Sequence, residues 1–229
     1  MKMLRNALVL IGLVGLLGMS SAFAGPKFSI VGVGNLPMPT ATSAAISAGG
    51  TTISSIPSPT GVFGFGGGAL IEIPFGTHLG LEIGGLYMQR KFSMDWTAAN
   101  AALGVTNYSL SALEVPVTFN IHLHRMIFLS VGGYVSSVFG TGTGTGADGT
   151  ALTVMPSDLF QRPMNFGLVG GLGFNIPLGT AFAFRAEGRY HLALQNQFDD
   201  ATTAADTTAS WKQNELQIYA GLTFGGGSK

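Results

Sequence analysis

The feature that most constrains this chain is a long, strict alternation of side-chain character. In residues 181–194, apolar side chains occupy the even positions, while Arg185, Glu187, Arg189 and His191 occupy odd ones. A period of two is typical of a β-strand whose two faces meet unlike surroundings. The same alternation appears in residues 77–92, 113–121 and 211–224.

Four weaker runs complete a set of eight predicted strands, at residues 27–36, 62–73, 126–139 and 164–176. The first of them is the weakest. Its register is ambiguous, because either Phe28 and Ile30 or Val31 and Val33 could form the apolar face.

The connections between these strands alternate in length. Three are short, around residues 74–76, 122–125 and 177–179. Four are long, at residues 37–61, 93–107, 140–163 and 195–210, and they contain all six aspartates. Transmembrane β-barrels join antiparallel strands by short periplasmic turns and longer external loops. Strand length also favours a transmembrane barrel, because the clear runs reach the roughly 9 to 11 residues that a tilted spanning strand needs.

Residues 1–24 have the layout of a secretory signal peptide. Lys2 and Arg5 form a positive start, a short apolar stretch follows, and Ala22-Phe23-Ala24 is a small-x-small cleavage site. The apolar stretch is shorter than the roughly 20 residues of a spanning helix. We therefore expect a signal peptide at 1–24 and a β-barrel at 25–229.

The amino-acid composition excludes several classes of protein. Only 10% of residues are charged, there are 35 glycines, no cysteine is present, and the net charge is zero. Disordered chains need more charge, nucleic-acid binders show a basic excess, and disulfide scaffolds need cysteines. An all-β protein remains, either a barrel in an outer membrane or a soluble secreted β-sandwich.

The glutamates all fall within predicted strands, opposite the apolar face. In a barrel in lipid, the face that carries the glutamates lines the lumen. Eight strands enclose a space that side chains can fill, and charges there need partners. The sequence therefore predicts a lumen charge network of Glu82, Arg90, Glu114, Arg185, Glu187, Arg189 and Glu215. In a sandwich, the same residues would face solvent.

Five stretches carry a resemblance to a known family. They read YSLSALEVPVTFNI (108–121), FLSVGGYVSS (128–137), MNFGLVGGLGFNI (164–176), FRAEGRYHLAL (184–194) and LQIYAGLTF (216–224). They resemble the bacterial outer-membrane β-barrel domain family, the porin-like relatives of the small OmpA/OmpX-type barrels. The resemblance implies an eight-stranded barrel, with roles that range over envelope integrity, adhesion and small-solute passage. It also implies that Phe224 is the last-strand aromatic read by the barrel-assembly machinery, although residues 225–229 follow it.

No motif predicts a catalytic, cofactor or metal site. His122 and His124 could share a strand face and hold a metal, but no third ligand is near them in sequence. His191 is expected to face the lumen near Arg189 and Glu187. With a serine it could form an acyl-transfer site, yet the sequence fixes no nucleophile. The glycine-rich run at 64–68 lacks the strand-to-helix context of a dinucleotide site, and GTGTGTG at 140–146 is expected to be a flexible loop.

The sequence therefore predicts an eight-stranded antiparallel up-and-down barrel in a bacterial outer membrane. We expect it to be non-enzymatic, with a lumen filled by the Glu/Arg network and external loops available for envelope or surface interactions. The alternative is a narrow channel or transporter for small solutes or apolar ligands. Expected partners are outer-membrane lipid, lipopolysaccharide and, during biogenesis, the barrel-assembly machinery, but not nucleic acid.

Overall fold

The computed structural model describes residues 25–42, 46–48, 51–53, 59–95, 105–145, 149–154, 164–179, 182–196 and 210–225. The predicted signal peptide at 1–24 lies outside these residues. The strands are β1 (Lys27–Thr42), β2 (Ile46–Ala48), β3 (Thr51–Ile53), β4 (Thr60–Val62), β5 (Gly64–Phe75), β6 (Leu79–Asp95), β7 (Val105–His122), β8 (Ile127–Thr145), β9 (Ala151–Val154), β10 (Met164–Pro177), β11 (Phe182–Ala193) and β12 (Ser210–Phe224). None of the described segments is a helix long and apolar enough to cross a membrane.

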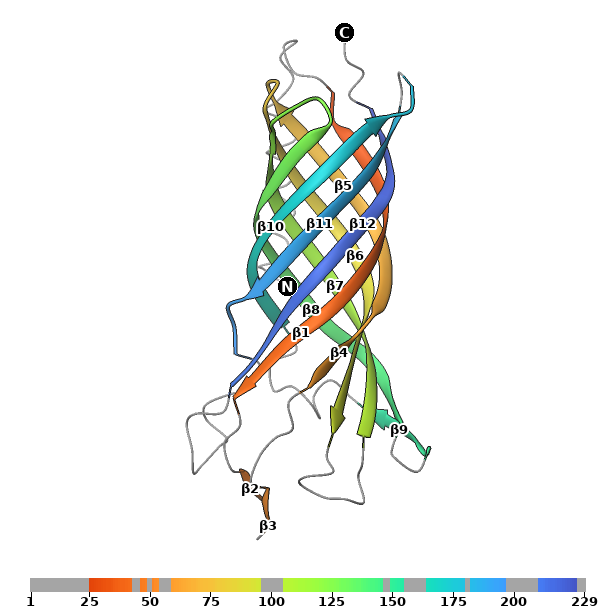
Figure 1. The fold of residues 1–229 in the computed structure, drawn as a ribbon, viewed down its shortest axis with the longest axis vertical. Helices are drawn as coiled ribbons and strands as arrows, with labels where there is room; N and C mark the ends of the chain where they lie inside the picture. Colours follow the sequence, from red (N-terminus) through yellow and green to blue (C-terminus); the bar gives the residue numbers. More distant parts are fainter. Residues whose placement is uncertain are drawn as a thin grey trace, which may run out of the picture.

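Eight of these strands close into an antiparallel barrel. Around the wall the order is β1, β5, β6, β7, β8, β10, β11 and β12, and β12 pairs with β1. Each strand therefore lies beside its neighbours in sequence, which confirms the predicted up-and-down topology. The strands are tilted, and the three short turns lie at the end where β1 begins and β12 finishes (Figure 1).

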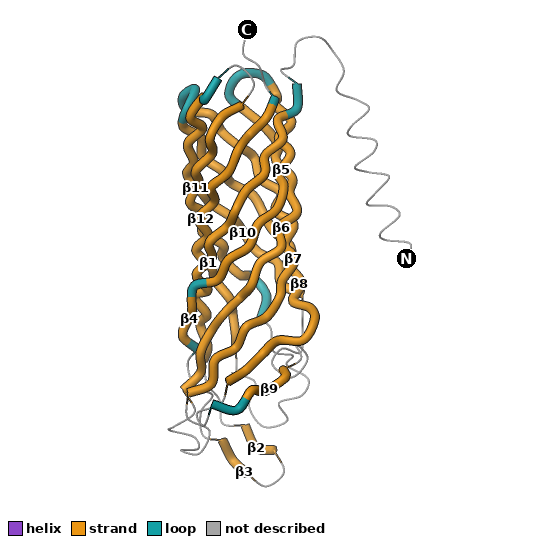
Figure 2. Tube along the Cα trace, turned by 90° about the vertical axis from the view of Figure 1, so that its right-hand side faces the viewer, coloured by secondary structure: helices purple, strands orange, loops and turns teal. Residues whose placement is uncertain are grey.

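The strands reach further toward the long loops than the sequence pattern indicated. β6 continues to Asp95, β8 continues to Thr145 and β1 continues to Thr42. The additional strands β4 and β9 pair with β6 and β8, and β2 pairs with β3. Figure 2 shows this extension beyond the regular wall, at the end away from the short turns.

Three expectations about the long loops are thus corrected. Asp95 ends a strand, and most of the GTGTGTG run is part of β8. Parts of the predicted loops at 37–61, 93–107 and 140–163 are strand. The physical reason lies in the faces of β6. Its outward face turns polar at Gln89 and Lys91, but beyond Arg90 its inward face is apolar and buried at Phe92 and Met94. The strand therefore continues after the pattern of a lipid-facing surface has ended.

The two faces of the wall follow the predicted parity. Along β12, for example, Leu216, Ile218 and Leu222 are exposed, whereas Gln217 and Tyr219 are buried. The structure also resolves the register of β1. Phe28 and Ile30 are 42% and 56% exposed, while Val31 and Val33 are each 3% exposed, so the two valines point inward.

The outward apolar band has the height of a membrane core. On β6 it runs over residues 79–87 and on β7 over residues 113–121. Nine residues at about 3.4 Å each, tilted by about 40°, span roughly 23 Å, against about 25 Å for the apolar band of outer-membrane barrels. At its edge toward the long loops, Tyr87 OH and Ser111 Oγ share a 2.9 Å hydrogen bond.

Inward glycines make room for large lumen side chains. A Cβ atom built on Gly173 would lie 2.2 Å from Cζ of Phe128, and one on Gly167 would lie 2.7 Å from Cε1 of Tyr134. Such distances are far below van der Waals contact. By contrast, a Cβ atom on the outward-facing Gly170 would meet nothing within 4 Å. Gly167 and Gly173 therefore serve the packing of the barrel interior.

Candidate functional site in the barrel lumen

All seven residues of the predicted charge network lie on the inner face of the wall. They come from β6, β7, β11 and β12, and each is at most 3% exposed: Glu82, Arg90, Glu114, Arg185, Glu187, Arg189 and Glu215. The inward parity of each strand directs them to a common axis. They form two clusters at different heights.

The turn-side cluster consists of Glu82, Glu187, Arg185 and Arg189. Arg185 donates from Nη1 to Glu82 Oε2 and from Nη2 to Glu187 Oε2, each at 2.5 Å. Arg189 donates from Nε to Glu187 Oε1 at 2.7 Å and from Nη2 to Glu82 Oε1. Ser130 Oγ also donates to Glu187, at 2.6 Å. Two carboxylates thus face two guanidinium groups, and the cluster is electrically balanced.

The loop-side cluster consists of Arg90, Glu114 and Glu215. Arg90 Nη2 lies 3.0 Å from Glu215 Oε2 and 3.1 Å from Glu114 Oε2. Its Nη1 donates to Ser136 Oγ at 3.1 Å, and Asn35 Nδ2 donates to Glu215 Oε1 at 2.6 Å. Here two carboxylates share one guanidinium.

Tyr219 and Gln217 connect the two clusters. The guanidinium carbon of Arg189 lies 4.5 Å from the centre of the Tyr219 ring, a cation–π contact. The Tyr219 hydroxyl donates to Gln217 Oε1, and Gln217 Nε2 donates to Glu114 at 3.3 Å. Side chains from opposite walls therefore meet across the lumen.

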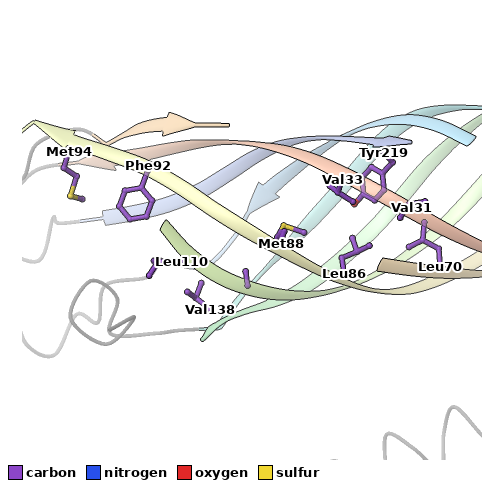
Figure 3. Packing of buried hydrophobic residues seen from close by; sticks show 11 residues of the cluster. Val31, Val33, Leu70, Leu86, Met88, Phe92, Met94, Leu110, Val138 and Tyr219 are labelled. Carbon is purple, nitrogen blue, oxygen red and sulfur yellow. The ribbon is translucent and has the colours of Figure 1, made fainter. Parts of the chain in front are cut away.

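An apolar cap lies between the loop-side cluster and the long loops. It consists of the buried residues Phe92, Met94, Leu110, Ala112 and Val138. Figure 3 shows the labelled members of the cap grouped toward the long-loop end. Phe92 also stacks on Tyr108, with ring centres 5.2 Å apart. The inner face is therefore apolar between the loop-side cluster and the long loops, a feature that the sequence analysis did not predict.

Comparison with known families identifies the fold. A family model described as the outer membrane protein beta-barrel domain matches residues 22–199. The chain belongs to this family. The protein is therefore a bacterial outer-membrane β-barrel, as the sequence analysis predicted. No curated protein matches it.

Solved outer-membrane barrels are similar to the chain at low sequence identity. OprG from Pseudomonas aeruginosa is 13% identical with a TM-score of 0.50, covering 88% of this chain and 96% of its own. Neisserial surface protein A is 12% identical with a TM-score of 0.45, covering 88% and 99%. The outer membrane protease OmpT from Escherichia coli is 11% identical with a TM-score of 0.42, covering 90% and 99%. At 13% identity the likeness to OprG concerns the fold alone.

In this outer-membrane barrel, a further charged group lies at the short-turn end, outside the predicted network. Glu72 Oε1 accepts from Lys27 Nζ at 2.8 Å and lies 3.0 Å from His122 Nε2. Asn120 Nδ2 joins Glu72 to the turn-side cluster by donating to Glu72 at 2.9 Å and to Glu82 at 3.1 Å. The signal that could have found Glu72 is its inward parity on β5.

The histidines do not assemble a metal site. His122 pairs with Glu72, and His124 Nδ1 accepts a long bond from the Met126 amide. Among the described residues, no group of three or more potential ligands could hold a metal ion. His191 lies in the lumen, fully buried, and its Nδ1 is 3.5 Å from Glu114 Oε1. No serine or threonine hydroxyl in the described residues bonds to its ring nitrogens, so an acyl-transfer pair is not assembled around it.

Proposed function

We propose that this protein is a non-enzymatic outer-membrane barrel whose closed lumen serves as a rigid support for its external face. The observation that carries this proposal is the burial of the lumen charges. Arg90, Arg185 and Arg189 are among the largest fully buried side chains, and each bonds to two carboxylates.

The burial of the network argues against the alternative of a narrow channel. A charged side chain that lines a water-filled path keeps exposed surface, whereas these groups are packed against one another and beneath the apolar cap. Opening a path would separate buried ion pairs, at a cost of several kcal/mol for each unpaired charge. The same burial denies a substrate access to His191 and the lumen carboxylates, which supports a non-enzymatic role.

The extension of the wall supports a role for the external loops. β6, β7 and β8 continue beyond the apolar band and carry polar outward residues there, such as Lys91 and Ser109. They would hold the long loops away from the membrane surface, where envelope or surface interactions take place. The outward apolar band would contact lipid and lipopolysaccharide acyl chains. Phe224, exposed at the end of β12, would be read by the barrel-assembly machinery.

Planar-bilayer recording tests the closed lumen. The full-length barrel, inserted at a density verified by fluorescence, is expected to give no discrete conductance steps. A variant that replaces Phe92, Met94 and Leu110 by alanine removes the cap but keeps both charge clusters, and we expect it to remain silent as well. Discrete steps in the wild-type protein would overturn the proposal in favour of a channel.

A further inference from the structure

The lumen charges do not balance everywhere. In the turn-side cluster, two glutamates face two arginines, and at the short-turn end Glu72 faces Lys27. In the loop-side cluster, Glu114 and Glu215 share only Arg90. One negative charge is therefore uncompensated in a buried place, where an isolated ion is very costly.

The two glutamates of this cluster are not equally satisfied. Glu215 accepts hydrogen bonds from Asn35 at 2.6 Å and from Nε of Arg90 at 3.1 Å, and Nη2 of Arg90 lies 3.0 Å from the same carboxylate. Glu114 accepts one bond from Arg90 at 3.1 Å and two long contacts from Gln217 at 3.3 and 3.4 Å. Glu215 thus has the hydrogen bonds that stabilise an ionised carboxylate. Glu114 has weaker ones, so it is the carboxyl group better suited to hold a proton.

His191 supplies an independent observation at the same place. Its side chain is fully buried, and neither ring nitrogen has a hydrogen-bond partner among the described residues. The Nδ1 atom points toward Glu114 Oε1, 3.5 Å away. A buried imidazole without partners normally costs free energy, and a proton shared with Glu114 gives Nδ1 a partner and so lowers that cost.

Other polar side chains from the neighbouring wall strands also face Glu114 and His191. The charged or titratable ones are Arg90, Tyr134, Glu187, Arg189, Glu215 and Tyr219. The neutral polar ones are Asn35, Ser136, Asn165 and Gln217. Among these groups, Glu114 shares its one arginine with Glu215, and His191 has two ring nitrogens without a hydrogen-bond partner.

We propose that Glu114 and His191 form a buried proton-binding site that holds one proton in the folded barrel and neutralises the loop-side cluster. The proton lies either on the carboxyl or on the imidazole, and the two forms share one macroscopic titration. Because free Glu and free His are deprotonated above about pH 4.3 and pH 6.5 respectively, unfolding above that range releases the proton. The folded state is then favoured less as the pH rises. The site makes the packing beneath the apolar cap sensitive to pH.

The test compares the pH dependence of unfolding for the full chain refolded into phosphatidylcholine vesicles. Urea titrations between about pH 6.5 and pH 9 are expected to show the wild-type folding equilibrium constant falling by up to tenfold per pH unit. Glu114→Gln removes the excess charge and should remove this fall. Glu72→Gln, the matched control in the balanced pair at the short-turn end, should keep it. An unchanged fall in Glu114→Gln would overturn the proposal.

A second measurement keeps the proposal testable if Glu114→Gln does not fold. Infrared spectra of the wild-type barrel, together with nitrogen NMR of its labelled histidines, report a protonated carboxylic acid or a buried imidazolium directly. We expect one of the two signals near neutral pH and its loss at high pH. The absence of both at neutral pH would overturn the proposal.

Discussion

Replacing Arg189 with methionine is expected to lower the free energy of unfolding by about 3–5 kcal/mol, the usual cost of removing one partner from a buried ion pair. The change removes the bonds from Arg189 to Glu82 and Glu187. It leaves both carboxylates sharing Arg185, and it also removes the cation–π contact with Tyr219. Urea titration of the barrel in phospholipid vesicles measures the loss.

Two variants control this experiment. The double change of Arg189→Met with Glu187→Gln removes one charge of each sign, so we expect it to be more stable than Arg189→Met alone. Arg125→Met alters an exposed arginine in a short turn and should change the free energy of unfolding by no more than about 0.5 kcal/mol. The account of the network would be contradicted if Arg189→Met behaved like Arg125→Met.

Adding a single methyl group to the inner wall at Gly173 is expected to destabilise the barrel by about 1–3 kcal/mol, the typical cost of overpacking a core. The new Cβ atom would lie 2.2 Å from the Phe128 ring. That ring cannot withdraw easily, because it is fully buried and lies beneath the Arg185 guanidinium, 4.8 Å from its carbon. Urea titration again provides the measurement.

The same strand offers a matched control. Gly170→Ala places its methyl group on the outward face, where nothing lies within 4 Å. We expect this variant to be as stable as the wild type or slightly more stable, because alanine loses less backbone entropy than glycine. Combining Gly173→Ala with Phe128→Leu should recover part of the loss. Equal destabilisation by Gly173→Ala and Gly170→Ala would contradict the assigned faces of β10.

For β11, the sequence alone was enough to predict which side chains face the lumen. In β11 the charged residues recur at every second position, so a closed barrel directs Arg185, Glu187 and Arg189 to one interior. The partners within that interior could not be predicted. Which carboxylate meets which guanidinium depends on the stagger between strands on opposite walls, and one sequence does not specify that stagger.

The sequence signal failed where one face of a strand changes character and the other does not. On β6, the outward apolar stripe ends at Gln89 and Lys91. The strand nevertheless continues, because the inward-facing Phe92 and Met94 are buried. On β1 both faces are apolar near Val31, so periodicity could not choose the register. The match between Gly173 and Phe128 was also invisible, because it joins positions far apart in the chain.

Site-directed labelling on β7 tests the central claim that apolar faces meet lipid while the lumen is closed. The chain has no cysteine, and Val117 and Thr118 are neighbours with 43% and 0% exposure. A nitroxide on the V117C variant should be relaxed by dissolved oxygen but not by a water-soluble nickel complex. The thiol of T118C should resist a water-soluble thiol reagent until urea unfolds the barrel. Relaxation of the V117C label by nickel, or reaction of T118C in the folded barrel, would contradict the account.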